Sequence, residues 1–191
     1  TIRFKNLETG EFYEDRLENT NGGAAWANDN KTVFYTTKNK VSLLSEKVHR
    51  HVLGDENTKD EMVYQEKDPS FYIGVYRSKS GKYIMIYNNS TISSDYHILN
   101  TDNPGGKFQQ FATREDNHEY SIDHFENKFY IVSNREALNF RLMETPEAAT
   151  SEENWKEVIA HREDVLLEDI EVFKNHLVIS ERSNASTYIK I

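Results

Sequence analysis

The sequence contains no cysteine, only three prolines and eight glycines among its 191 residues, and no long run of apolar residues. The absence of cysteine excludes disulfides, thiol nucleophiles and cysteine-ligated zinc or iron–sulfur centres. No segment approaches the ~20 apolar residues that a membrane-spanning helix needs, so a membrane is not an expected partner. Basic residues are also few, since 23 Lys and Arg stand against 32 Asp and Glu, for a formal net charge of −9. Nucleic-acid-binding surfaces are normally basic, so nucleic acid is not an expected partner either.

The start of the chain is not expected to be a signal peptide. Residues 1–10 lack the basic start and the apolar centre of a signal peptide. We therefore expect a cytoplasmic protein, and a periplasmic location stays open because the absence of cysteine suits both compartments. The chain begins without methionine and ends at Ile191 within an apolar alternation, which suggests a piece cut from a longer protein.

Short aromatic and β-branched runs recur along the chain. Aromatic residues make up 12% of it, and the runs are bounded by Asn, Asp, Gly and Ser. Such runs suit a pleated, packed surface, whereas a helix needs apolar residues at helical spacing over ~10 or more positions. The best helical candidate, 146–155, is expected to be a loop with at most one or two turns. Strands are predicted at 32–36, 71–76, 83–87, 128–132 and 177–179.

Four longer segments share one pattern of strand, tight polar turn and strand, namely 24–35, 73–86, 120–131 and 170–179. If Val33, Ile84, Phe129 and Leu177 are equivalent positions, the spacings are 51, 45 and 48 residues. That period is close to the ~40–50 residues of a four-stranded propeller blade. Further strand-like runs follow each pair, as a blade of four strands requires.

We therefore predict an all-β fold, an incomplete β-propeller that forms an open arc of about four blades. Each blade is expected to be a four-stranded antiparallel meander. Whole blades are assigned to about 24–64, 71–112 and 119–159, an incomplete blade to 165–191, and the outer strands of a preceding blade to 1–13. A β-sandwich or partial barrel, also built from short strands, is the alternative.

Seven histidines invite a search for a metal site. His49 and His51 stand at i and i+2, on one face of a strand, but no third ligand is obvious nearby. His118 and His124 are six residues apart, whereas the helical zinc motif needs a spacing of four. On a strand these two rings would lie ~20 Å apart. No metal site is assigned.

Nucleophilic and phosphate-binding motifs are not found either. The string Gly-x-Ser-x-Gly is absent, and the adjacent Asp123 and His124 would point to opposite faces of a strand. Gly22–Gly23 and Gly105–Gly106 lack the lysine and serine of a phosphate-binding loop and are interpreted as turns. With 32 acidic residues, chance pairs of carboxylates are expected, so they do not indicate a glycosidase.

Strings spread along the whole chain, in a fixed order and spacing, give a further indication. They are IRFKNLETG (2–10), WAND (26–29), VHRH (48–51), LG (53–54), YQEKD (64–68), HEYSIDH (118–124), FY (129–130), SNR (133–135), NF (139–140), HR (161–162), LE (167–168) and ER (181–182). Together they resemble the N-terminal propeller of the oligopeptidase B, or protease II, branch of the prolyl oligopeptidase family. The stretch 118–134 is the most specific part.

The resemblance implies a seven-bladed propeller that caps an α/β-hydrolase domain carrying a Ser, Asp and His triad, with cleavage of small peptides after Arg or Lys. None of those catalytic positions falls within this chain. No catalytic, substrate-binding or metal-binding residue and no cofactor is therefore assigned, and the chain alone is expected to be inactive. The implied partners are peptide substrates and the C-terminal hydrolase domain, with the propeller admitting peptides and excluding folded proteins.

A second hypothesis is a non-catalytic β-propeller-like interaction module. Exposed aromatic residues such as Trp26, Tyr87 and Trp155 would then form its contact surface, although packing between blades is the commoner role for such side chains. In either case an open arc leaves two blade faces bare, so self-association of the chain through these faces is expected.

Overall fold

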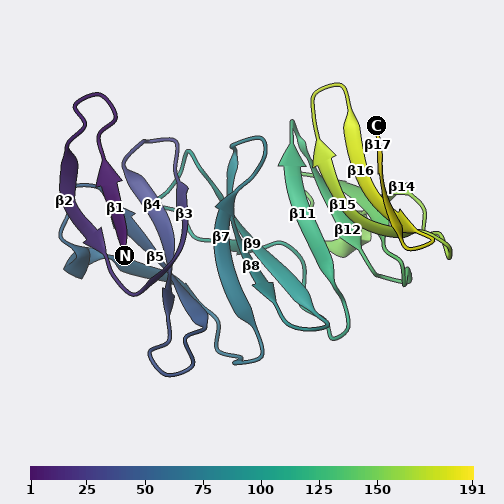
Figure 1. Cartoon of the computed structure of the whole chain (residues 1–191), viewed down its shortest axis with the longest axis horizontal. Coiled ribbons are helices and arrows are strands. Elements are labelled where there is room, and N and C mark those ends of the chain that lie inside the picture. The colour runs from purple at the N-terminus through teal and green to yellow at the C-terminus, as the bar shows by residue number, and fades with distance from the viewer. The chain divides into compact units, whose positions relative to one another are not determined.

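The computed structural model describes all of residues 1–191 and consists of seventeen β-strands and two 3-10 helices (Figure 1). Strands β1 (Ile2–Lys5) and β2 (Phe12–Leu17) form a two-stranded sheet. Strands β3 (Thr20–Trp26), β4 (Thr32–Lys38), β5 (Ser45–Val52) and β6 (Glu61–Gln65) form a four-stranded sheet.

Two more four-stranded sheets and one three-stranded sheet follow. The first contains β7 (Tyr72–Arg77), β8 (Tyr83–Asn89), β9 (Ser94–Asn100) and β10 (Gln109–Gln110). The second contains β11 (Tyr120–Phe125), β12 (Lys128–Ser133), β13 (Arg141–Pro146) and β14 (Lys156–Ile159), and the third contains β15 (Leu166–Val172), β16 (Leu177–Ser183) and β17 (Ser186–Lys190). The 3-10 helices are η1 (Asn57–Lys59) and η2 (Glu152–Asn154).

In every sheet the strands follow one another in chain order, and no sheet closes on itself. The prediction of an all-β chain built from antiparallel meanders is confirmed. The repeat is also real, because Val33, Ile84, Phe129 and Leu177 all lie at the start of the second strand of their sheets.

The chain divides into two compact units. Unit 1 comprises Thr1–Arg77, Gly81–Ser90 and His97–Gln109, and unit 2 comprises Ser78–Ser80, Thr91–Tyr96 and Gln110–Ile191. The sheet β7–β10 contributes residues to both units.

The core of unit 1 lies between the sheet β3–β6 and strand β7, which packs against β3, β4 and β5. Ile73 and Val75 from β7 meet Phe34 from β4 and Val48 from β5 in one buried apolar cluster. Strand β4 is buried along Thr32–Tyr35 and beyond, as expected for an interior strand made of β-branched and aromatic residues.

The interpretation of Gly22 and Gly23 as a turn is wrong. Gly22 and Gly23 do not form a turn but lie inside β3, where the pairing with β4 shifts register between Thr20 and Ala24. Gly22 has a φ of +87°, a conformation that residues with a Cβ rarely adopt. The pair therefore makes a β-bulge, which the spacing of turn residues alone did not reveal.

The core of unit 2 is an aromatic cluster centred on Phe111. Its ring centroid lies 4.9 Å from that of Phe129, 6.1 Å from that of Trp155 and 6.3 Å from that of Tyr120. All four side chains are buried, and the indole N–H of Trp155 donates to the carbonyl of Thr150 over 2.8 Å. Edge and tilted contacts of this kind add to the free energy of burying the rings.

His118 belongs to the same cluster and is held as a neutral imidazole. Its Nδ1 accepts a hydrogen bond from the Arg135 guanidinium over 3.2 Å, so its Nε2 carries the proton and donates to the Ser133 hydroxyl over 2.9 Å. Burial, together with the nearby Arg135 charge, lowers the pKa of His118. Arg135 is in turn paired with Glu115 and Glu152, at 2.7 and 2.6 Å.

Replacing Phe111 with Ala is expected to lower the free energy of unfolding by about 3–5 kcal/mol, because a fully buried ring leaves a cavity among rings that cannot collapse. Urea unfolding followed by tryptophan fluorescence measures this loss. The control is Leu138→Ala, an exposed site where a change within about 0.5 kcal/mol is expected. A Phe111→Ala variant as stable as the control would show that this cluster is not the core of unit 2.

The state of His118 predicts that acid weakens the fold. Below the ordinary histidine pKa of ~6.5, residue 118 binds a proton in the unfolded chain but much less in the folded one, because its folded-state pKa is lowered. The free energy of unfolding therefore falls as the pH drops from 7 to 5. Urea unfolding of wild type and His118→Gln at several pH values separates this contribution from that of other groups. The variant is expected to depend less steeply on pH, and equal slopes in the two proteins would contradict the assignment.

Candidate functional site

The histidines at 49 and 51 do lie on one face of β5, but the structure gives them different surroundings. The ring of His51 is completely buried in unit 1 between two carboxylates, with Nε2 2.9 Å from Asp15 Oδ1 and Nδ1 2.8 Å from Asp60 Oδ1. His49 is partly exposed, stacks on the Tyr35 ring at 5.4 Å and shares a hydrogen bond with the Thr37 hydroxyl.

The carboxylates around His51 are themselves saturated with donors. Asp15 Oδ1 also accepts the Gly54 N–H over 2.7 Å, and Asp60 Oδ2 accepts the Tyr35 hydroxyl over 2.8 Å. Burial opposes ionisation of Asp15, but the hydrogen bonds from Gly54 and His51 outweigh it and lower the pKa of this carboxyl. Both ring nitrogens of His51 are occupied, and the chain holds no group of three or more His, Asp or Glu arranged to bind a metal ion.

The other histidine pair is not brought together. His118 precedes β11 and contacts Ser133 and Arg135, whereas His124, within β11, is buried against the Phe129 ring at 4.7 Å. The two rings therefore serve separate hydrogen-bond networks in unit 2.

His124 does form an arrangement that the sequence did not predict. Its Nδ1 lies 2.7 Å from the hydroxyl of Ser80, and its Nε2 lies 3.2 Å from a carboxylate oxygen of Glu147. The order serine, imidazole and carboxylate is that of a hydrolase triad. Ser80 and Glu147 lie 44 and 23 residues from His124 in the chain, so no local spacing could have indicated the contact.

This arrangement ties segments of unit 2 together. The His124 ring is completely buried, so a substrate held at Ser80 has no access to the imidazole. The Ser80 N–H already donates to the His124 carbonyl, and the Lys79 N–H donates to Asp123. The turn at Lys79 and Ser80 is thus fastened to β11 by three hydrogen bonds. Asp123 and His124 thus both contact the Lys79–Ser80 turn, Asp123 through the Lys79 N–H and His124 through the Ser80 hydroxyl.

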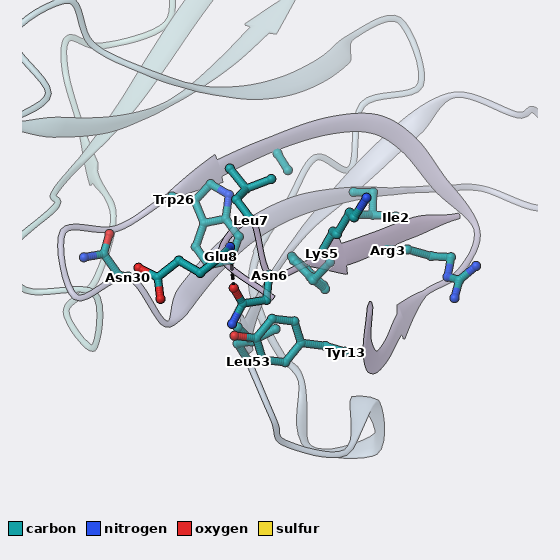
Figure 2. Close-up of a pocket in the computed structure, with 12 residues that line it drawn as sticks. Ile2, Arg3, Lys5, Asn6, Leu7, Glu8, Tyr13, Trp26, Asn30 and Leu53 are labelled. Carbon is teal, nitrogen blue, oxygen red and sulfur yellow. Dashed lines mark hydrogen bonds between the residues drawn. The ribbon is translucent and has the colours of Figure 1, made fainter. Parts of the chain in front are cut away.

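An open hollow of about 790 Å³ lies in unit 1 beside the hairpin β1–β2 (Figure 2). Trp26, Leu7 and Leu53 give it apolar walls. Arg3 and Lys5 bring positive charge, and Glu8 brings negative charge. The Trp26 ring packs edge-on against Phe4 at 5.5 Å and remains 38% exposed. Its lining thus combines apolar, aromatic and charged side chains.

Other residues noted in the sequence fall into packing or loop positions. Trp155, expected to be exposed under the interaction-module hypothesis, is buried, and Tyr87 is only partly exposed because its ring lies over Gly74. Gly105 and Gly106 lie in the loop after β9, as predicted. No helix in the structure has the length and apolar character to cross a membrane.

Among curated proteins, the chain is 40% identical to dipeptidyl aminopeptidase BI from Pseudoxanthomonas mexicana, over all of this chain and 26% of that protein. It is 33% identical to protease 2 from Moraxella lacunata, over 99% of this chain and 27% of that protein. The chain therefore spans about a quarter of the length of these relatives.

Solved structures give a matching result. Oligopeptidase B from Leishmania major superposes with a TM-score of 0.89 at 28% identity, over 97% of this chain and 26% of that one. The closed form of oligopeptidase B from Trypanosoma brucei with covalently bound antipain gives a TM-score of 0.84 at 29% identity, over 92% of this chain and 25% of that one.

The resemblance noted in the sequence is thereby confirmed. The family described as prolyl oligopeptidase, N-terminal beta-propeller domain, matches residues 1–191. Because that match covers the whole chain and agrees with the meanders of the structure, the chain belongs to the N-terminal β-propeller family of the prolyl oligopeptidases.

Proposed function

We propose that this chain is part of the propeller of a cytoplasmic serine oligopeptidase that hydrolyses small peptides after Arg or Lys. The observation that carries the proposal is the superposition on oligopeptidase B from Leishmania major over nearly the whole chain. In this proposal the propeller admits peptides by size, and an α/β-hydrolase domain in the remainder of the protein supplies the catalytic triad.

Two features of the chain support a role in admitting peptides by size, with no catalytic step of its own. Its sheets are held by antiparallel pairing, and an opening bordered by such sheets would pass an extended peptide more readily than a folded protein. The formal net charge of −9 would also attract basic peptides through its long-range field.

Self-association of the isolated chain also belongs to the proposal. Every residue of β17 is exposed, including Tyr188 and Ile189, and this strand forms an edge of its sheet. An uncovered edge strand with apolar side chains favours pairing with another chain.

A second candidate activity for the whole protein is removal of dipeptides from peptide N-termini. It is favoured by the 40% identity to a protein named dipeptidyl aminopeptidase BI. The two candidates differ in whether the substrate must have a free amino terminus.

The 191-residue chain alone is expected to show no turnover of an Arg-containing amide and no labelling by a fluorophosphonate, because its only serine–imidazole–carboxylate arrangement is closed by burial of His124. Mass spectrometry of the treated chain measures the labelling. Stoichiometric modification of Ser80, abolished by Ser80→Ala and retained in Ser121→Ala, would contradict the absence of catalysis.

The longer protein that contains this chain is expected to cleave short peptides after Arg or Lys, with kcat/KM falling steeply when the same bond lies in a folded protein. Peptides with free and with blocked amino termini separate the two candidate activities. Cleavage of blocked peptides after Arg supports the oligopeptidase, whereas a strict need for a free terminus supports the dipeptidyl aminopeptidase. Equal cleavage of peptides and folded proteins would overturn the gate.

A further inference from the structure

The loop between β4 and β5 in unit 1 exposes three large aliphatic side chains. Val41 is 93% exposed, Leu43 67% and Leu44 42%. Turn and loop residues are normally polar, and the loop between β3 and β4 of the same sheet follows that rule with the sequence ANDNK at 27–31. Both strands that flank the β4–β5 loop are interior strands of a four-stranded sheet, so the loop is not part of a frayed edge.

The loop is fixed by its own hydrogen bonds. The side-chain oxygen of Asn39 accepts the N–H of Val41 over 2.8 Å and that of Ser42 over 3.1 Å. In the backbone, the Asn39 N–H donates to the Leu44 carbonyl over 2.8 Å, and the Leu43 N–H donates to the Asn39 carbonyl over 3.0 Å. Local bonds of this kind define a turn. The aliphatic side chains are therefore held on an ordered backbone.

The backbone of Leu43 is unusual for its residue type. Its φ is +61°, in the left-handed region that glycine, asparagine and aspartate adopt at lower cost than leucine. Its side chain gains little in return within this chain, because most of it is exposed. A leucine that favours neither the turn nor the core indicates that its side chain is buried against a partner.

A hollow of about 300 Å³ adjoins the loop. Its apolar lining consists of Val41, Leu44, Pro69 and Phe71. The β4–β5 loop and the connection between β6 and β7 form its walls, and the Glu66 N–H joins them by donating to the Glu46 carbonyl over 2.9 Å. An exposed apolar tip beside a hollow suits a folded surface of matching relief, whereas an extended peptide has no concavity to receive the tip.

We propose that the β4–β5 loop is a docking surface for the part of the longer protein outside residues 1–191, with Val41 and Leu43 seated in an apolar concavity of that part. This inference rests on the proposed function, in which the remainder of the protein contains an α/β-hydrolase domain. The chain spans about a quarter of the length of its curated relatives, so most of such a protein is available to cover the loop. Because the partner is tethered, its effective concentration is high, and a small apolar contact is sufficient.

Hydroxyl-radical footprinting of the longer protein, read by mass spectrometry, tests the docking directly. Val41 and Leu43 are expected to oxidise about 10-fold more slowly than in the same protein in denaturing urea, because the core of an interface excludes water. Oxidation of both residues at the denatured rate would overturn the proposal. So would protection that appears only at high protein concentration, which indicates a second copy, or only with a saturating Arg-containing peptide, which indicates substrate.

A variant of the longer protein provides the second arm. Leu43→Asp places a charge in the apolar contact, so oxidation of Val41 is expected to rise by about 10-fold. Folding is not at risk, since the side chain is exposed in this chain. The matched control is Met62→Asp, at a 47% exposed residue of β6 in the same sheet, which is expected to leave Val41 protected. Equal protection of Val41 in Leu43→Asp and wild type would contradict the docking.

The same samples separate this inference from the proposed function. Cleavage of amino-terminally blocked peptides after Arg is measured beside the footprint. A wild-type protein that cleaves them while Val41 stays reactive contradicts only the docking surface. A protein with Val41 protected that does not cleave them supports the docking surface and contradicts only the proposed specificity.

Discussion

The structure depends on the burial of the second strand in its four-stranded sheets. Residues 32–36 of β4, 84–86 of β8 and 131–133 of β12 are buried without the alternation seen on a strand with one solvent face. Such a strand has neighbours on both edges and packing on both faces, so its apolar and β-branched residues supply the main free energy of folding. The outer strands of each sheet are held in place by hydrogen bonding and packing that build outward from this buried strand.

Buried histidines add specificity to that apolar framework. His51, His118 and His124 each join segments that are distant in the chain, and each does so with a different set of partners. A buried imidazole must have both nitrogens satisfied, so each ring permits only one arrangement of the surrounding segments. These rings are therefore best understood as positioning groups of the fold, even where the order of atoms resembles that of a catalytic triad.

The separate roles of the apolar core and the hydrogen-bonded histidines bear on function. The buried histidines of this chain are used for internal contacts, which keep strand edges and surface hollows in fixed positions. That is the physical requirement for a domain that selects what reaches a reaction centre located elsewhere. The chain belongs to a propeller family of peptidases, and selection of substrates is the role proposed for it above.

The sequence by itself determined the fold class, the strand period and the family. Runs such as 32–36 and 128–132 favour strands because of their own β-branched and aromatic side chains. The repeat is equally local, since it is marked by the positions of Val33, Ile84, Phe129 and Leu177. Only the tertiary structure decided the bulge at Gly22 and Gly23 and the partners of His51 and His124. Asp15 lies 36 residues from His51, and Ser80 and Glu147 lie 44 and 23 residues from His124; contacts over such separations are set by how sheets pack, which no local pattern encodes.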